Sequence, residues 1–253
     1  MIQEPFAYGE SWVYKLDPRL KIAGAVVLSV TAALVKDFRA LGVVLAFSIL
    51  LVLSAKLKPL AVGKRLLSIL GFMLLIWLVL PLTYEGEPLY SIGPLTVTRP
   101  GVLLCAQITL KSVSILLLFM ALISTMTIAT LGHALDGLRV PVKLVQLLLM
   151  TYRYIFVIEQ EYQRLTTAIK IRGFRSGTNL HSYRTFAYLI GMLFVRASVR
   201  AKQVQNAMAC RGFRGRFYSL AEYKPFRGNW LFLAMMIWMT LVLIFLEIGR
   251  YGY

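Results

Sequence analysis

Charged side chains are scarce in this 253-residue chain, at only 15% of it, whereas 58% of the residues are hydrophobic. Soluble globular domains carry about 25% charged and about 45–50% apolar residues. The composition therefore excludes an ordinary soluble domain, and it excludes intrinsic disorder and a collagen-like fibre as well. We expect an all-α integral membrane protein.

Cysteine and histidine are also rare, with two residues of each. Cys105 lies in an apolar run and Cys210 in a basic segment, so we expect no disulfide. His133 and His181 lie far apart in sequence, and no cluster of His, Asp and Glu has the spacing of metal ligands. The sequence lacks a Walker A motif or any other glycine-rich phosphate loop. We therefore expect no enzyme activity, no metal and no cofactor in this chain.

Long apolar runs are what the chain does have. A helix needs about 20 apolar residues to cross about 30 Å of hydrocarbon. About five transmembrane helices are predicted, over Ile22–Val35 with its flanks, Ala40–Ala55, Leu66–Leu82, a long stretch within Val102–Thr130, and Trp230–Ile248. The first two runs are short and predict a tight hairpin around residues 36–39. The fourth run contains Lys111, so either Ser112–Thr130 is the buried part or the Lys111 side chain extends toward an interface.

The distribution of charge predicts the orientation of these spans, because short cytoplasmic loops retain Lys and Arg. The loop between the second and third runs contains four basic residues (Lys56, Lys58, Lys64 and Arg65). The loop over residues 83–100 has only Arg99, against Glu85 and Glu87. We therefore expect the N-terminus to be cytoplasmic and Tyr253 external. No signal peptide is visible, so we expect the N-terminus to be retained.

Most of the excess positive charge lies in residues 131–228, which hold sixteen basic and four acidic residues, a net charge of +12. A basic surface of this size suits nucleic acid or anionic lipid, but charge that simply holds the segment on the cytoplasmic side is the favoured reading. We expect no nucleic-acid partner. Three regions follow: a four-span bundle over 1–130, a cytoplasmic segment of cytosolic and interfacial helices over 131–228, and a last transmembrane helix over 229–253.

A repeat with an offset of 39 residues lies inside the basic segment. Apolar residues spaced 3, 4, 3 and 4 apart predict two helices, each with a narrow apolar seam of the kind that packs against another helix. The first seam is Ile155, Ile158, Tyr162, Leu165 and Ile169, and the second is Phe194, Ala197, Ala201, Val204 and Met208.

The same Arg-Gly-Phe-Arg sequence follows both seams, at Arg172–Arg175 and Arg211–Arg214. Each copy predicts a helix C-terminus, because glycine adopts the left-handed conformation and a following apolar residue folds back on the last turn. An arginine before the glycine suits the negative end of the helix dipole. A cap does not require this arginine to continue the apolar seam, yet it does so in both copies. We therefore expect two equivalent contacts for a symmetric partner.

At these residues the chain resembles the transmembrane T component of an energy-coupling factor (ECF) transporter, in the CbiQ/EcfT family, and most resembles the kind found in cobalt systems. Leu16–Lys21 (Leu-Asp-Pro-Arg-Leu-Lys) matches the family's Leu-Asp-Pro-Arg approach to the first span. Tyr152–Tyr154 followed by Glu159 is similar to the lead into the family's first coupling helix. The two tips match its paired Ala-Arg-Gly signatures, with Ile171 and Cys210 in place of alanine.

The resemblance implies a mechanism in which this chain transmits work. Two ATP-binding cassette ATPase subunits form a dimer, and each has a groove that receives one arginine tip. Closure of the dimer on ATP draws the tips together and tilts a separate substrate-binding membrane subunit. The implied ATPase-contacting residues are Ile171, Arg172, Gly173, Cys210, Arg211 and Gly212, supported by Asp17, Pro18 and Arg19.

The resemblance also implies partners, location and cargo. The substrate-binding subunit would be CbiM-like, with a small CbiN-like subunit as an option, in a prokaryotic inner membrane. The cargo would be cobalt ion, used in cobalamin biosynthesis, with nickel or a vitamin left open.

Two rival functions are also compatible with the sequence. A membrane enzyme acting on an anionic lipid would need a nucleophile, an acid–base pair or a metal cluster, and the candidates are few. A permease that carries substrate itself would need ionisable residues at mid-span, where Lys111 is the clear candidate. Asp17–Arg19 has an equally good explanation as a simple helix start.

Overall fold

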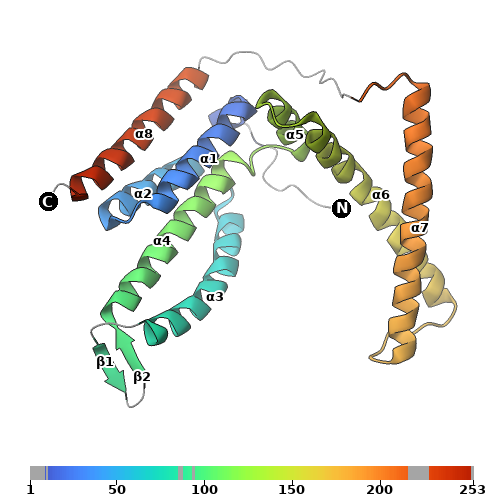
Figure 1. Cartoon of the computed structure of the whole chain (residues 1–253), viewed down its shortest axis with the longest axis horizontal. Coiled ribbons are helices and arrows are strands. Elements are labelled where there is room, and N and C mark those ends of the chain that lie inside the picture. Colours follow the sequence, from blue (N-terminus) through green and yellow to red (C-terminus); the bar gives the residue numbers. More distant parts are fainter. Residues whose placement is uncertain (1–8, 10, 85–87, 93–94, 216–227, 252–253) are drawn as a thin grey trace. The chain divides into compact units, whose positions relative to one another are not determined.

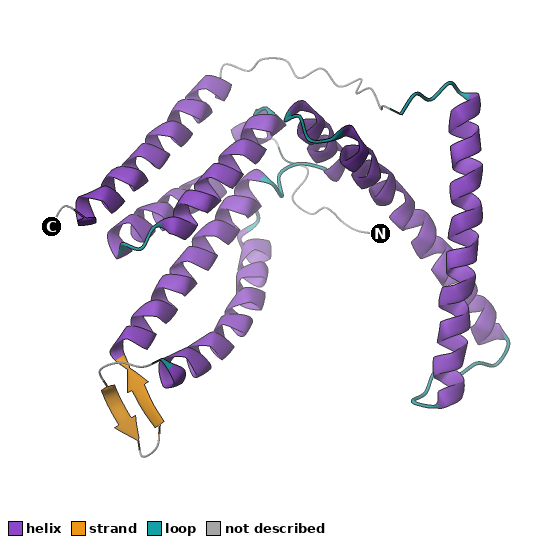
Figure 2. Ribbon diagram, viewed as in Figure 1, coloured by secondary structure: helices purple, strands orange, loops and turns teal. Residues whose placement is uncertain are grey.

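The computed structural model describes residues 9, 11–84, 88–92, 95–215 and 228–251, which are almost wholly α-helical (Figure 1, Figure 2). These residues divide into two compact units, and the boundary falls inside α5 (Ile128–Gly137). Residues 9–134 and 228–251 form one unit, and residues 135–215 form the other. Glu222 and Tyr253, on which parts of the charge and orientation predictions depend, lie outside the described residues.

The apolar runs fall on the helices of the larger unit: α1 (Pro18–Leu34), α2 (Phe38–Ser54), α3 (Pro59–Thr83), α4 (Arg99–Leu122) and α8 (Gly228–Tyr251). Three of these helices, α3, α4 and α8, are long and apolar enough to cross a membrane, and α2 is apolar but shorter. The all-α membrane class is confirmed. The number of five spans stays a prediction, because α1 and α2 have 17 residues each, or about 26 Å of helix.

Helix α4 occupies the first part of the predicted fourth run and stops at Leu122, before the end of that run at Thr130. The last carbonyls of a helix have no partner inside it. Here the Thr125 hydroxyl is within 3.0 Å of the Ala121 carbonyl oxygen and 3.1 Å of that of Leu122. The hydroxyl therefore satisfies the helix end, and the chain turns before α5 begins.

The Leu-Asp-Pro-Arg sequence begins α1 in the way that its residue types predict. Asp17 is the N-cap, and its carboxylate accepts the Arg19 amide at 2.9 Å, with Pro18 at the first helical position. The Asp17 amide in turn donates to the side-chain oxygen of Asn229 on α8, at 3.1 Å. These residues therefore tie the start of α1 to the start of α8. Lys21 is buried, with its ammonium 5.9 Å from the centre of the Tyr14 ring.

The core of this unit lies among α1, α2, α4 and α8. Small residues allow helices in a bilayer to approach closely, because packing rather than the hydrophobic effect drives their association. Ala25 and Ala32 on α1 and Ala40 on α2 are fully buried at these contacts. The larger buried side chains are Leu41, Leu118, Met120, Phe232, Met239 and Leu243.

Polar side chains satisfy the backbone where the chain breaks between α1 and α2. Lys111 on α4 donates from Nζ to the Ala33 carbonyl at 2.7 Å, and Gln107 donates to the Lys36 carbonyl at 2.8 Å. From α8, a carboxylate oxygen of Glu247 accepts the Lys36 amide at 3.1 Å. Lys111 therefore has a structural role as a donor to the unpaired end of a helix.

The connection between α3 and α4 contains an antiparallel pair of strands that the sequence analysis did not predict. Strands β1 (Pro88–Ile92) and β2 (Leu95–Thr98) pair with a register shift between Pro88 and Tyr90. The Thr98 hydroxyl donates to the Tyr84 carbonyl at 2.9 Å, which joins the hairpin to the end of α3.

The smaller unit consists mainly of α6 (Val142–Ile171) and α7 (Leu180–Cys210), which form a helical hairpin. Figure 1 shows α7, in orange, crossing α6 and running back from the short connection. Both predicted seams lie on these helices, one on each. The Ser182 hydroxyl accepts the Gly177 amide at 3.1 Å and closes the connection at the start of α7.

Candidate functional site

The first arginine tip has the cap that the sequence predicts. Gly173 has a φ of 81°, in the left-handed region. Its amide donates to the Lys170 carbonyl at 3.0 Å, and the Phe174 amide donates to the Ile169 carbonyl at 3.2 Å. These two bonds are those of a Schellman motif, in which they satisfy carbonyls at the helix end. Arg172 is the C-cap residue.

The second tip repeats this geometry. Gly212 has a φ of 73°, and its amide donates to the Ala209 carbonyl at 3.0 Å. The Phe213 amide donates to the Met208 carbonyl, also at 3.0 Å. Arg211 is the C-cap of α7, as Arg172 is of α6. The prediction of two equivalent caps is therefore confirmed at the level of the backbone.

Both tips are exposed on the surface of their unit. The arginines, the glycines and Cys210 are all exposed, and Ile171 exposes 81% of its surface. A Cβ atom built on either glycine would meet no atom within 4 Å. The conformation of the backbone, and not a lack of space inside the chain, is therefore what requires glycine at these two positions.

The side chains that support the two tips differ. At the first tip the Phe174 ring lies edge-on to Phe186, with 5.8 Å between ring centres, and 6.1 Å from the His181 ring. His181, which the sequence left unassigned, therefore contacts the aromatic residue behind this tip. After the second tip, the side-chain amide of Gln146 donates to the Gly215 carbonyl and ties that end to α6.

The tips lie at different ends of the hairpin. Arg172 precedes the connection between α6 and α7, whereas Arg211 ends α7 after its full length (Figure 1). The hairpin therefore brings neither tip against the other. Asp17, Pro18 and Arg19, the predicted supporting residues, belong to the other unit, at the start of α1.

The apolar seams pack less completely than expected. Phe194 exposes 72% of its surface, and Ile155 and Tyr162 are also exposed. A groove of about 700 Å³ lies between α6 and α7 and leaves part of both seams, including Ile155, uncovered. Apolar residues of both seams line this groove, among them Ile155, Ile158, Val204 and Met208.

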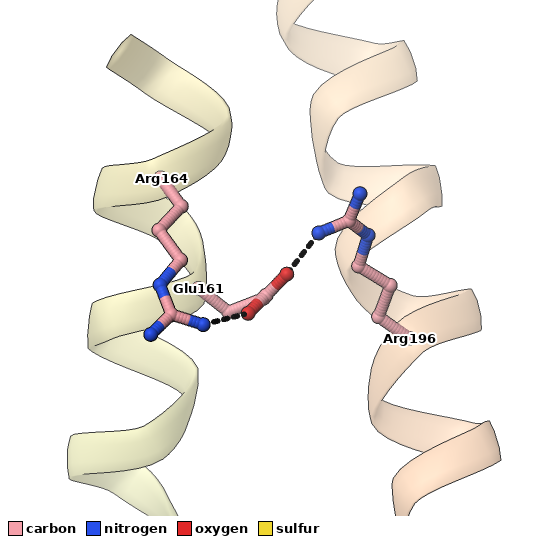
Figure 3. Close-up of polar contacts among 3 residues, drawn as sticks. All are labelled: Glu161, Arg164 and Arg196. Atoms are coloured by element: carbon pink, nitrogen blue, oxygen red, sulfur yellow. Dashed lines mark hydrogen bonds and ion pairs between the residues drawn. The ribbon is translucent and has the colours of Figure 1, made fainter. Parts of the chain in front are cut away.

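An ion pair joins the two helices where they cross, and the sequence analysis did not predict it (Figure 3). Glu161 on α6 accepts a hydrogen bond from the Arg196 guanidinium on α7, and Arg164 on its own helix lies 3.6 Å away. The hydrogen bond from Arg196 holds the pKa of Glu161 below its ordinary value of 4.5, and the charges of Arg196, Arg164 and Arg200 add to this effect. The available signal was that acidic residues are few in this strongly basic segment.

No catalytic constellation accompanies these features in the part of the chain that the structure describes. No group of three or more His, Cys, Asp and Glu side chains could hold a metal ion there. Cys105 and Cys210 are free thiols, one buried and one exposed. The fold and the site thus define a helical membrane protein that carries a hairpin with two exposed, identically capped arginine tips.

Comparison with known proteins agrees with this class. The profile of the family described as "Cobalt transport protein" (CbiQ) matches residues 9–222, so the chain belongs to that family. It is 28% identical over 221 positions to the energy-coupling factor transporter transmembrane protein EcfT of Leuconostoc gelidum, covering 83% of this chain and 82% of the relative.

Proteins of the same name from other bacteria are similar over at least as much of the chain. The Listeria innocua protein is 29% identical over 229 positions, covering 85% of each chain. The Macrococcus caseolyticus protein is 28% identical over 267 aligned positions, covering 98% of each. The similarity therefore includes the hairpin and both tips as well as the membrane helices.

Proposed function

We propose that this chain is the energy-coupling transmembrane subunit of an ECF-type ABC importer. The tips Ile171–Gly173 and Cys210–Gly212 each dock in a groove on one of two ATP-binding cassette ATPase subunits. The observation that carries the proposal is the identical cap, with the same left-handed glycine and the same two backbone hydrogen bonds at both tips. Two like ends on one chain suit a partner with two-fold symmetry.

Arginine is the anchor of each contact in this proposal. Its planar guanidinium makes paired hydrogen bonds to a carboxylate, and such charge-assisted bonds contribute about 1.5–3 kcal/mol each. Because the Schellman cap already fixes the backbone at Arg172 and Arg211, docking orders only the side chain. At the first tip the exposed Ile171 adds an apolar contact to the groove.

Closure of the ATPase dimer on ATP then moves the tips, and the helical hairpin transmits that motion. A continuous helix suits this task, and α6 and α7 run for 30 and 31 residues. The motion tilts a separate substrate-binding membrane subunit, which releases its cargo. This chain performs no chemistry in the cycle.

The cargo proposed here is cobalt ion, held by a CbiM-like subunit with a small CbiN-like subunit as an option. The description of the matching family as cobalt transport proteins supports this choice. The similar curated proteins carry the name of an energy-coupling component without a substrate, so nickel or a vitamin is the alternative cargo. The N-terminus is proposed to be cytoplasmic and the C-terminus external in a prokaryotic inner membrane, on the basis of the basic loop at Lys56–Arg65.

Two other functions have less support. A permease that carries substrate itself would use Lys111, but that ammonium is engaged by the Ala33 carbonyl. An enzyme acting on an anionic lipid would need a cluster of reactive side chains, and His133 and His181 lie in different units.

The test is reversal of both tip charges, Arg172→Glu with Arg211→Glu, in the full transporter complex. We expect the double variant to insert in the membrane normally, to lose transport and to release the ATPases on purification, with smaller losses for either single change. Arg175→Glu with Arg214→Glu is the matched control, because these arginines lie beyond the caps. Normal co-purification of the ATPases with the double tip variant would show that the tips do not dock there.

A further inference from the structure

A directional contact joins α6 and α7 at their crossing. Glu161 exposes only 17% of its side chain there, and its carboxylate accepts the hydrogen bond of Arg196 from the opposite helix. Helix α7 carries four basic residues and no acid. An ion pair across the hairpin therefore has to take its acid from α6, and Glu161 supplies it.

Apolar packing beside this pair is incomplete. A cavity of about 250 Å³ adjoins the pair, lined by Val157, Leu193 and Val199 together with the paired residues. Close-packed interlocking side chains would fix the register of two helices without help, whereas a loosely packed contact permits sliding. The pair in Figure 3 is thus a directional contact at a crossing where apolar packing alone leaves the register loosely fixed.

The register of the crossing determines how far apart the tips lie. Eleven residues separate Glu161 from Arg172, and fifteen separate Arg196 from Arg211, which correspond to helix lengths of roughly 16 and 22 Å on opposite sides of the crossing. Along antiparallel helices the two arginine Cα atoms would therefore lie about 40 Å apart, and they lie closer if the helices cross at an angle. A slip of α7 by one turn along α6 changes this separation by about 5 Å.

We propose that Glu161 and Arg196 are positioning residues, which fix the register of the α6–α7 crossing and thereby the distance between the two arginine tips. This inference rests on the proposed docking of the tips, since two grooves on a rigid partner accept only one spacing. Arg164 contributes charge but not register, because it lies on the same helix as Glu161 and exposes 72% of its side chain.

The chain offers equivalent label sites for measuring this distance. Cys210 is exposed beside the second tip, and Ile171 occupies the equivalent position at the first. We would place nitroxide labels at Ile171→Cys and Cys210 in a Cys105→Ala background and measure their separation by pulsed electron–electron double resonance. The full chain is held in nanodiscs of phosphatidylethanolamine and phosphatidylglycerol.

We expect one narrow distribution of label distances for the doubly labelled chain without further changes, and the same distribution for Arg164→Gln, the matched control. Glu161→Arg and Arg196→Glu should each shift the mean by about 5 Å, one helical turn, or broaden the distribution about twofold. The two changes combined should restore the parent distribution, which also shows that the helices still fold. Unchanged distances in the single reversals, or no rescue in the combination, would overturn the inference.

Co-purification of the ATPases with the same variants, without labels, separates this inference from the proposed function. If ATPase binding is lost in each single charge reversal and returns in the double reversal, both the positioning role and the docking of the tips are supported. If the distances respond as expected but ATPase binding never changes, the docking of the tips is wrong while the positioning role stands. If the tip reversals at Arg172 and Arg211 release the ATPases but the crossing variants leave the distances unaltered, only the positioning role fails.

Discussion

Replacement of the two cap glycines tests whether the tips are held in the left-handed conformation. Gly173 and Gly212 have φ values of 81° and 73°, and a Cβ atom at either position would meet nothing within 4 Å. Alanine therefore adds no clash with other parts of the chain, and the cost of Gly173→Ala or Gly212→Ala is backbone strain alone. For an L-residue in this region that strain is about 1–2 kcal/mol.

Hydrogen exchange measures this cost locally, where global unfolding of a membrane protein would not. The amides of Gly173 and Phe174 donate the two bonds of the first cap, and those of Gly212 and Phe213 donate the bonds of the second. If the free energy of local opening of the cap falls by about 1–2 kcal/mol, amide exchange there becomes about 5- to 30-fold faster. We expect this increase in peptides that cover the altered tip and no increase at the other tip.

Gly191→Ala is the matched control, because it makes the same substitution inside α7, also with open space around the new Cβ. There the backbone is helical, so alanine should stabilise the helix, by about 0.5–1 kcal/mol. We therefore expect slower exchange around Gly191→Ala and faster exchange around the altered tips. Unchanged exchange at both altered tips would refute the assignment of strained, glycine-dependent caps.

Two further predictions concern pH and accessibility. Because Arg196 lowers the pKa of Glu161 below 4.5, the crossing pair should be intact from about pH 5 to 8 and should weaken only as the pH falls below about 4.5. The tip distance measured by double resonance should follow this course, and a change between pH 6 and 7 would contradict it. A membrane-impermeant maleimide should label Cys210 but not the buried Cys105. Labelling should occur in inside-out vesicles and not in intact cells, and the reverse result would invert the proposed orientation.

The caps were predictable from sequence because their determinants are local. A Schellman motif needs a glycine, an apolar residue after it and a helix before it, and all of these lie within six residues of one another. The start of α1 was predictable for the same reason, since the Asp17 carboxylate accepts an amide only two residues away. Apolar runs long enough to span a bilayer are similarly local, which explains why they fall on helices in the structure.

The features that sequence reasoning missed depend on residues far apart in the chain. Glu161 and Arg196 are 35 positions apart, and Lys111 lies 78 positions from the carbonyl that it contacts. Nothing in the neighbouring sequence distinguishes Arg196 from the other arginines of α7. The Thr125 hydroxyl bonds carbonyls at the end of α4, and hydropathy does not register such a bond.

Stability of the helices does not account for arginine at both tips. A cation at a helix C-terminus interacts favourably with the dipole by about 0.3–1 kcal/mol, and lysine would serve as well. Within the described part of the chain, neither the Arg172 nor the Arg211 side chain makes a hydrogen bond or ion pair, whereas Arg196 and Arg164 both contact Glu161. A planar guanidinium is specifically suited to paired hydrogen bonds with a carboxylate. Its repeated placement at an exposed, preformed cap is thus not required by helix stability, and the proposed docking on a partner would account for it.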